Sequence, residues 1–137
     1  MTKIERLRLP EDNAVFGGNK VFALFKYNPA VKAGGLVFIA GQVGIRADGT
    51  VPDSAEEQIR LAFQRLGEVL KQMGLDFSDL VELVSYHVGV DTQLATFRAV
   101  KDEFITADFP AWTILGVAAL ARPNMLIEIK AVAAARG

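Results

Sequence analysis

The sequence predicts a single α+β domain in which a mixed β-sheet carries two helices on one face. Three observations support this class. The chain has 137 residues, of which 51% are hydrophobic and 23% charged. Two segments have helical periodicity, and several short apolar segments are rich in branched and aromatic residues. The elements follow the order strands, helix, strand, helix, two strands. A chain of this length can bury a core as one unit, so we expect one domain over residues 1–137, with residues 1–25 as an N-terminal extension.

The first 35 residues contain one predicted strand and several turns. Residues 3–9, KIERLRL, alternate charged and apolar side chains, which is typical of an edge strand. The segment that follows mixes turn signals with short apolar runs. From Leu36, LVFIAGQVG has the composition of a strong strand, and Asp48-Gly49 predicts the turn that follows it.

The clearest helix covers residues 54–74. Ser54 with Glu57 three residues later forms a capping-box pattern, and Gly74 supplies the stop. Acidic residues around Ser54 complement the helix dipole, which explains them without a metal ion. One apolar stripe follows a 3.6-residue period: Ile59, Ala62, Phe63, Leu66, Val69, Leu70 and Met73.

A second strong strand is predicted from Leu80, and a shorter helix over residues 92–105. Either Asp91 or Thr92 has a side chain suited to cap this helix. After Pro110, residues 111–120 and 125–133 are predicted to form two strands joined as an antiparallel hairpin.

The last two strands also predict self-association. In residues 125–133 the odd positions are apolar, whereas the even ones include Glu128 and Lys130, so the odd side should face the helices. Both faces of residues 111–120 are apolar. Two helices cover about one face of a four-stranded sheet, so the other face predicts a homo-oligomer interface.

Composition excludes several classes of function. The formal net charge is −1, so no broad field attracts nucleic acid or an anionic membrane. The chain has no cysteine, which excludes thiolate chemistry and disulfides. Residues 1–12 lack the apolar stretch of a signal peptide, and no apolar run approaches the ~20 residues of a membrane span. We expect a cytoplasmic protein that binds neither nucleic acid nor membrane.

In this order and spacing, the chain resembles the Rid family of reactive-intermediate deaminases, the YjgF-type proteins also labelled L-PSP endoribonucleases. The resemblance runs from about Tyr27 to Ala133. It rests on YNPAVKAGGLVFIAGQVG, on PDSAEEQIRLAFQRLGEVLKQMG, and on the pair FPAWTILGVAAL and MLIEIKAVA. It implies a chorismate-mutase-like homotrimer with a small-molecule cleft between subunits. It also implies hydrolysis of imines or enamines of 2-amino acids with release of ammonia; no cofactor is expected.

The chain departs from the family pattern at two positions. Trp112 follows Pro110-Ala111 where the family has an arginine that pairs with the substrate carboxylate. Lys130 stands where we expect the family's water-activating glutamate. Indole has one N–H and no charge, so it cannot replace a guanidinium. We therefore expect a cleft relined by Trp112 and Lys130 with an altered substrate preference. Alternatively, Trp112 anchors a subunit interface and Lys130 is a solvated or ion-paired strand residue.

The candidate site residues follow from this resemblance and from residue chemistry. The candidate catalytic residues are Tyr27, Lys130 and His87. The candidate ligand-binding residues are Trp112, Ile114, Gly41, Asn28, Asp91 and Glu128. Three have structural alternatives: Tyr27 in a loop, His87 hydrogen-bonded under a helix, and Asp91 as a helix cap.

The expected function is hydrolysis of the C=N bond of an imine or enamine, and the alternative is a non-catalytic metabolite-binding protein. RNA cleavage has little support, because it needs a positioned acid and base together with phosphate-binding cations. One histidine and a near-neutral charge offer little of that.

Overall fold

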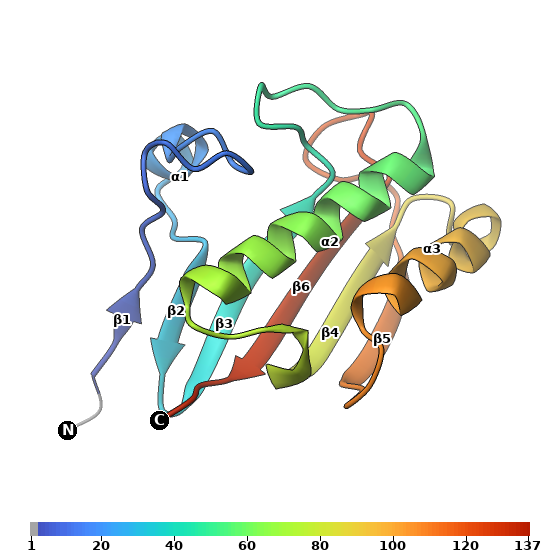
Figure 1. Ribbon diagram of the computed structural model, residues 1–137. Coiled ribbons are helices and arrows are strands. Elements are labelled where there is room, and N and C mark those ends of the chain that lie inside the picture. The colour runs from blue at the N-terminus through green and yellow to red at the C-terminus, as the bar shows by residue number, and fades with distance from the viewer. Residues whose placement is uncertain (1–2) are drawn as a thin grey trace.

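The computed structural model describes residues 3–137 and shows one six-stranded sheet with the two long helices, α2 and α3, packed on one face (Figure 1). The predicted α+β class is confirmed. The elements are β1 (Glu5–Arg6), α1 (Lys20–Phe25), β2 (Ala30–Ala33), β3 (Leu36–Val43), α2 (Ala55–Gln72), a 3₁₀ turn η1 (Phe77–Asp79), β4 (Leu80–His87), α3 (Val90–Phe104), β5 (Ala111–Gly116) and β6 (Ile127–Ala134). No helix within residues 3–137 combines the length and the apolar character needed to cross a membrane.

The strand order is β1-β2-β3-β6-β4-β5, and this order corrects the predicted hairpin of the last two strands. Strand β6 lies between β3 and β4 and is antiparallel to both, whereas β5 is parallel to β4. Helix α3 connects β4 to β5, and such a crossover places its second strand parallel to the first. The segment after β5 then passes the end of β4, where Val88 donates its N–H to the Leu126 carbonyl at 3.0 Å.

The helix starts differ in how well the sequence predicts them. In α2, the Ser54 hydroxyl accepts a hydrogen bond from the Glu57 N–H at 3.3 Å, as predicted, whereas the Glu57 carboxylate pairs with Arg46. Helix α3 starts at Val90, and its N-cap is Gly89 with φ 76°. The predicted cap at Asp91 or Thr92 is wrong, because glycine adopts this left-handed conformation readily and the helix begins two residues before the predicted start at Thr92.

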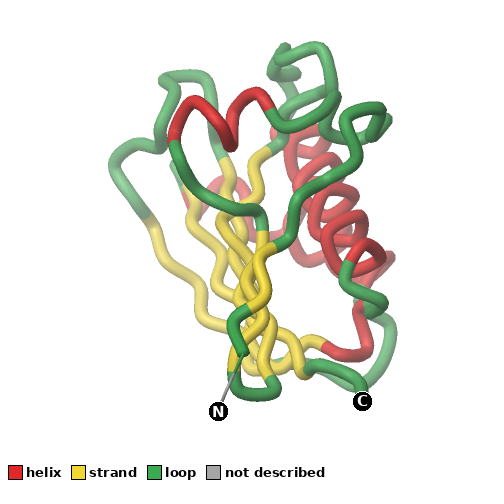
Figure 2. Tube along the Cα trace, turned by 90° about the vertical axis from the view of Figure 1, so that its left-hand side faces the viewer, coloured by secondary structure: helices red, strands yellow, loops and turns green. Residues whose placement is uncertain are grey.

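The helices bury one face of the sheet and leave the other face exposed. The odd positions of β6, from Ile127 to Ala133, are buried as predicted. The opposite face carries exposed apolar side chains: Leu36 is 37% exposed, Phe38 47% and Leu115 43%. Figure 2 shows the strands as one layer with α2 along one side. The structure of one chain therefore leaves an apolar sheet face open to solvent.

A chain of buried polar side chains lies between the sheet and α3. The Nδ1 atom of His87 lies 2.7 Å from Oε1 of Gln93, whose amide nitrogen is already committed to the carbonyls of Val88 and Leu126. Nδ1 must therefore carry the proton. Nε2 then accepts from the Ser85 hydroxyl at 2.8 Å, and that oxygen accepts from Nε1 of Trp112 at 2.9 Å.

We expect Ser85→Ala to lower the free energy of unfolding by about 1–3 kcal/mol, because it leaves buried polar groups of His87 and Trp112 without a partner. Urea unfolding measures this loss. Thr106→Ala, at an exposed position, is the control and should change stability by less than about 0.5 kcal/mol. Equal effects of the two substitutions would contradict a structural role for this chain of hydrogen bonds.

Candidate functional site

A cavity of about 420 Å³ lies where β3 and β6 meet α1, α2 and the segment before β6. A mostly apolar cavity with a few polar groups is the usual form of a small-molecule site. Its apolar lining consists of Phe16, Val21, Phe22, Phe25, Val43, Ile45, Ala121 and Met125. Its other lining residues are Tyr27, Gly41, Gln42, Arg65, Arg122 and Glu128.

Gly41 makes room for the carboxylate of Glu128. The pairing register of β3 with β6 shifts between Ile39 and Gln42, so Gly41 lies in an irregular part of the strand. A Cβ atom added to Gly41 would lie 2.7 Å from Cδ of Glu128. Because that distance is too short for any side chain, glycine at this position allows the carboxyl group to lie against the β3 backbone.

The carboxyl group of Glu128 is half-buried in this cavity. Burial raises its pKa above that of an ordinary glutamate, and no cation within residues 3–137 contributes a lowering effect. A carboxyl group with a raised pKa exchanges a proton near neutral pH more readily than an exposed one.

Tyr27 lies two residues after the end of α1 and also lines the cavity. Its ring and that of Phe22 form a T-shaped pair at a centroid distance of 5.0 Å, and its backbone N–H donates to the Phe22 carbonyl at 3.1 Å. Burial raises the pKa of its hydroxyl, with a lowering influence from Arg65 and a raising one from Glu128. The hydroxyl therefore stays protonated at neutral pH and can donate a hydrogen bond.

Arg65 is a cavity residue that the sequence analysis missed. It comes from α2 and is only 7% exposed. Its Nε donates to the Ile45 carbonyl at 2.8 Å, and its guanidinium carbon lies 4.5 Å from the centre of the Phe16 ring. The signal was its position: Arg65 is three residues after Ala62 and one before Leu66, inside the apolar stripe of α2.

Trp112 and Lys130 do not share a cavity within one chain. Trp112 is the direct neighbour of Leu83 across β4 and β5, and Leu83 is fully buried under the helices. Lys130 is the neighbour of Val84 and is exposed on the other face. Leu83 of β4 pairs with both Trp112 and Ala131, so these three side chains share one face of the sheet. Lys130 is next to Ala131 in β6 and therefore points to the opposite face from Trp112.

Trp112 is partly buried and packs against the hydrophobic core. Its ring stacks on Phe97 at a centroid distance of 5.6 Å, and Nζ of Lys101 lies 4.9 Å from its centre. Its only N–H is committed to Ser85. Lys130 lies on the same strand face as Glu128 but does not line the cavity. Of Glu128 and Lys130, only Glu128 therefore lines the cavity.

Three other candidates also lie outside the cavity. His87 is fully buried beneath α3, and burial lowers its pKa, with the Gln93 hydrogen bond acting in the opposite direction. Asp91 is exposed in the first turn of α3. Ile114 is 39% exposed on β5, at the edge of the sheet. The structure thus favours the structural alternative for His87 and gives Asp91 and Ile114 no place in the cavity of a single chain.

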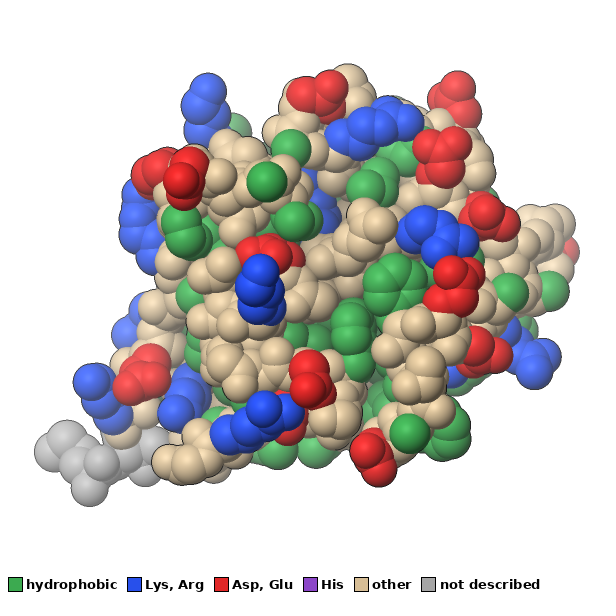
Figure 3. Space-filling view, in the orientation of Figure 1, with side chains coloured by type: hydrophobic (Ala, Val, Ile, Leu, Met, Phe, Trp, Pro, Cys, Tyr) green, Lys and Arg blue, Asp and Glu red, His purple; other side chains and the backbone are tan. Residues whose placement is uncertain are grey.

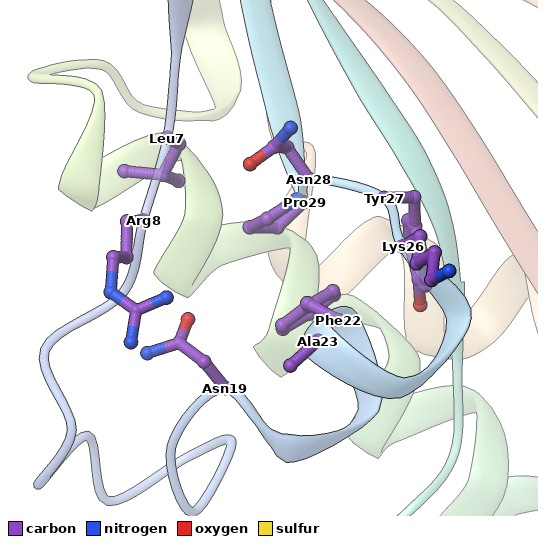
Figure 4. A pocket seen from close by; sticks show the side chains of 9 residues that line it. All are labelled: Leu7, Arg8, Asn19, Phe22, Ala23, Lys26, Tyr27, Asn28 and Pro29. Carbon is purple, nitrogen blue, oxygen red and sulfur yellow. The ribbon is translucent and has the colours of Figure 1, made fainter.

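Asn28 belongs to a neighbouring, smaller pocket of about 250 Å³ between the N-terminal segment and α1. Figure 4 shows this pocket, with Arg8 and Asn19 on one side and Tyr27 on the other. The Asn19 side chain bonds both the N–H and the carbonyl of Leu9, which fixes the N-terminal segment beside α1. Tyr27 lines both pockets. Of the predicted site residues, Tyr27, Gly41 and Glu128 therefore share the larger pocket, and Asn28 lines the smaller one beside it.

Comparison of the sequence and the fold with known proteins identifies related chains. Residues 18–135 match the family model described as endoribonuclease L-PSP. The chain is 37% identical over 126 residues to the RutC family protein YjgH of Escherichia coli, covering 90% of this chain and 95% of that protein. It is 30% identical over 113 residues to the mouse 2-iminobutanoate/2-iminopropanoate deaminase, covering 81% and 82%. A solved structure of protein YJGH has a TM-score of 0.80 at 35% identity, covering 86% of this chain and 90% of that one.

We expect Glu128→Gln to stabilise the protein, and the gain should grow with pH. The pKa of Glu128 is higher in the folded chain than its unfolded value of about 4.3. The wild type therefore loses stability relative to the glutamine variant as pH rises between the two values. Melting temperatures between pH 4 and 8 measure this difference, with Glu56→Gln on the exposed side of α2 as control. A difference that does not change with pH would contradict the buried, unpaired state of this carboxyl group.

Proposed function

The chain belongs to the endoribonuclease L-PSP family, also called the YjgF or Rid family, and we propose that it hydrolyses small imines or enamines in the cavity lined by Tyr27, Gly41 and Glu128. Relatives named imine deaminases support the general reaction class. The observation that carries the proposal is the half-buried carboxyl group of Glu128, which faces an apolar cavity beside a protonated tyrosine.

In the proposed reaction, Glu128 transfers protons between water and the substrate nitrogen. Water attacks the carbon of a protonated C=N bond, the C–O bond forms, and the π electron pair moves to nitrogen. The carboxylate of Glu128 accepts the proton that water loses and then gives it to the amino group of the tetrahedral intermediate. Ammonia leaves as the C=O bond forms, and the hydroxyl proton passes to solvent. A carboxyl group with a raised pKa suits both proton transfers.

Tyr27 and Gly41 support this step in different ways. The Tyr27 hydroxyl can donate a hydrogen bond to the oxygen that adds to the substrate, which orients it in the cavity. Gly41 is a positioning residue, because its missing side chain leaves the space that the Glu128 carboxyl group occupies. The apolar walls favour a substrate with an apolar or aromatic side chain. Trp112 cannot bind a carboxylate in its own chain, because its N–H is committed to Ser85.

An RNA-cleaving activity finds less support in this arrangement. Its usual acid and base would be histidines, and His87 lies in the core away from the cavity. On the face shown in Figure 3, acidic and basic side chains are interspersed rather than gathered by sign. Such a face offers no cationic surface for a phosphate backbone.

The open sheet face leads us to propose a homotrimer with the cavity near a subunit boundary. Light scattering coupled to size exclusion should then give three times the 14.8 kDa mass of one chain. Phe38→Lys should lower that mass, because it places a charge in the apolar face around Leu36 and Leu115. Lys71→Glu on α2 is the control. A wild-type mass of one chain would contradict this part of the proposal.

The hydrolase proposal predicts ammonia release from imines that an amino-acid oxidase generates in situ. We expect wild-type protein to accelerate this release for apolar and aromatic imines, and Glu128→Gln to reduce the rate by about 10²-fold or more. Glu56→Gln removes the same charge from the α2 surface and should leave the rate unchanged. A full rate in Glu128→Gln would contradict the role of Glu128. Thermal stabilisation by ligand without any turnover would instead support a metabolite-binding protein.

A further inference from the structure

We infer that Arg65 is an anion-binding residue of the cavity, and that its ligands are small organic anions with an apolar body. The inference rests on the proposed function only in taking this cavity as the ligand site. It assigns a specificity-determining role to Arg65 of α2. In the family pattern the carboxylate-binding arginine instead corresponds to position 112, which lies on β5.

The first observation is that Arg65 is buried without an acidic partner. It is more than nine-tenths buried. Within residues 3–137 its only hydrogen bonds go to backbone carbonyls, from Nε to Ile45 at 2.8 Å and from Nη2 to Arg46 at 3.5 Å. Burial lowers its pKa to about 10, with a raising influence from Tyr27, and no carboxylate in that part of the chain contributes. Buried cations in proteins are usually paired, so Arg65 is a charge that lacks its counterion.

The second observation concerns the remaining guanidinium nitrogen, Nη1. This atom makes none of the hydrogen bonds found within residues 3–137. Yet no buried side-chain nitrogen or oxygen in that part of the chain lacks a partner. Nη1 therefore keeps some exposure, and the side chain that carries it lines the cavity, so we take its N–H groups as the donors open to a ligand there.

The third observation is that the cavity keeps its two kinds of charge apart. Tyr27 is influenced by both Arg65 and Glu128, whereas neither of those two is a cause of the other's shifted pKa. Arg65 reaches the cavity from α2 and Glu128 reaches it from β6, so its buried cation and its carboxyl group come from different elements. A ligand with a carboxylate at one end and a protonated C=N group at the other matches this arrangement.

Arg122 is the other arginine that lines the cavity, and its geometry is less suited to this role. It is exposed, and both terminal nitrogens point toward the Gly49 carbonyl at 3.3 and 3.4 Å. An exposed guanidinium is screened by water and ions, whereas a buried one interacts with an anion at lower dielectric. Arg122 is therefore a matched control for Arg65.

The test uses two probes that differ in charge but hardly in shape, phenylacetate and phenylacetamide, with affinities measured by isothermal titration calorimetry. We expect wild-type protein to bind the acid at least tenfold more tightly than the amide. Arg65→Met should remove this preference without weakening the amide, and Arg122→Gln should keep it. Equal binding of both probes by the wild type, no binding of the acid, or a preference that follows Arg122 instead of Arg65 would each overturn the inference.

A second measurement needs no variant, in case Arg65→Met does not fold. In wild-type protein, phenylacetate at saturation should shift the ¹⁵N–¹H side-chain signal of Arg65 by more than phenylacetamide does; an Arg65 signal that the acid leaves unchanged, or shifts no more than the amide, would overturn the inference. Neither probe has a C=N bond, so both results are independent of turnover. Failure of the ammonia assay alone removes the hydrolase proposal, and failure of the probe measurements alone removes the role of Arg65.

Discussion

The close approach of the Glu128 carboxyl group to the β3 backbone is the constraint on which the site depends. It requires glycine at position 41, because any Cβ there would collide with the carboxyl carbon. It also requires the register shift between Ile39 and Gln42, which brings this stretch of β3 against Glu128 of β6. The carboxyl group is thus held in a partly buried place, and burial raises its pKa. The sheet thereby fixes both the position of an acid–base group and the readiness with which it exchanges a proton.

The second feature of the site is that its charges remain unneutralised. Arg65 and Glu128 line the same cavity, yet they form no ion pair with each other, and each is partly or wholly removed from water. Keeping two unpaired charges in such a place costs folding free energy. Proteins commonly tolerate costs of this kind where a ligand supplies the missing partners. The rest of the domain supplies stability through the apolar stripe of α2 and the buried face of β6.

Much of this architecture could be predicted from the sequence, because it depends on local patterns. The apolar stripe and Ser54 cap of α2 and the inward side of β6 all follow from short segments. Tyr27, Gly41 and Glu128 were among the nine candidate site residues, and they line one cavity. The errors concern pairing between distant segments. Alternation along one strand shows which residues of that strand share a face. How the faces of β5 and β6 align depends on the pairing of both strands with β4. This pairing places Trp112 and Lys130 on opposite faces of the sheet. The apparent hairpin failed for the same reason. Arg65 was missed because its stripe was interpreted as apolar core alone.

The central claim is that ligands bind between Arg65 and Glu128, rather than against Trp112 and Lys130. A crystal structure of the protein with phenylpyruvate, the keto acid expected from hydrolysis of an aromatic imine, tests this claim most directly. The account predicts the carboxylate on the guanidinium of Arg65, the carbonyl carbon beside Glu128 and Tyr27, and the phenyl ring among the apolar walls. A ligand bound only on the sheet face around Lys130, or beside Trp112 with the cavity empty, would contradict it.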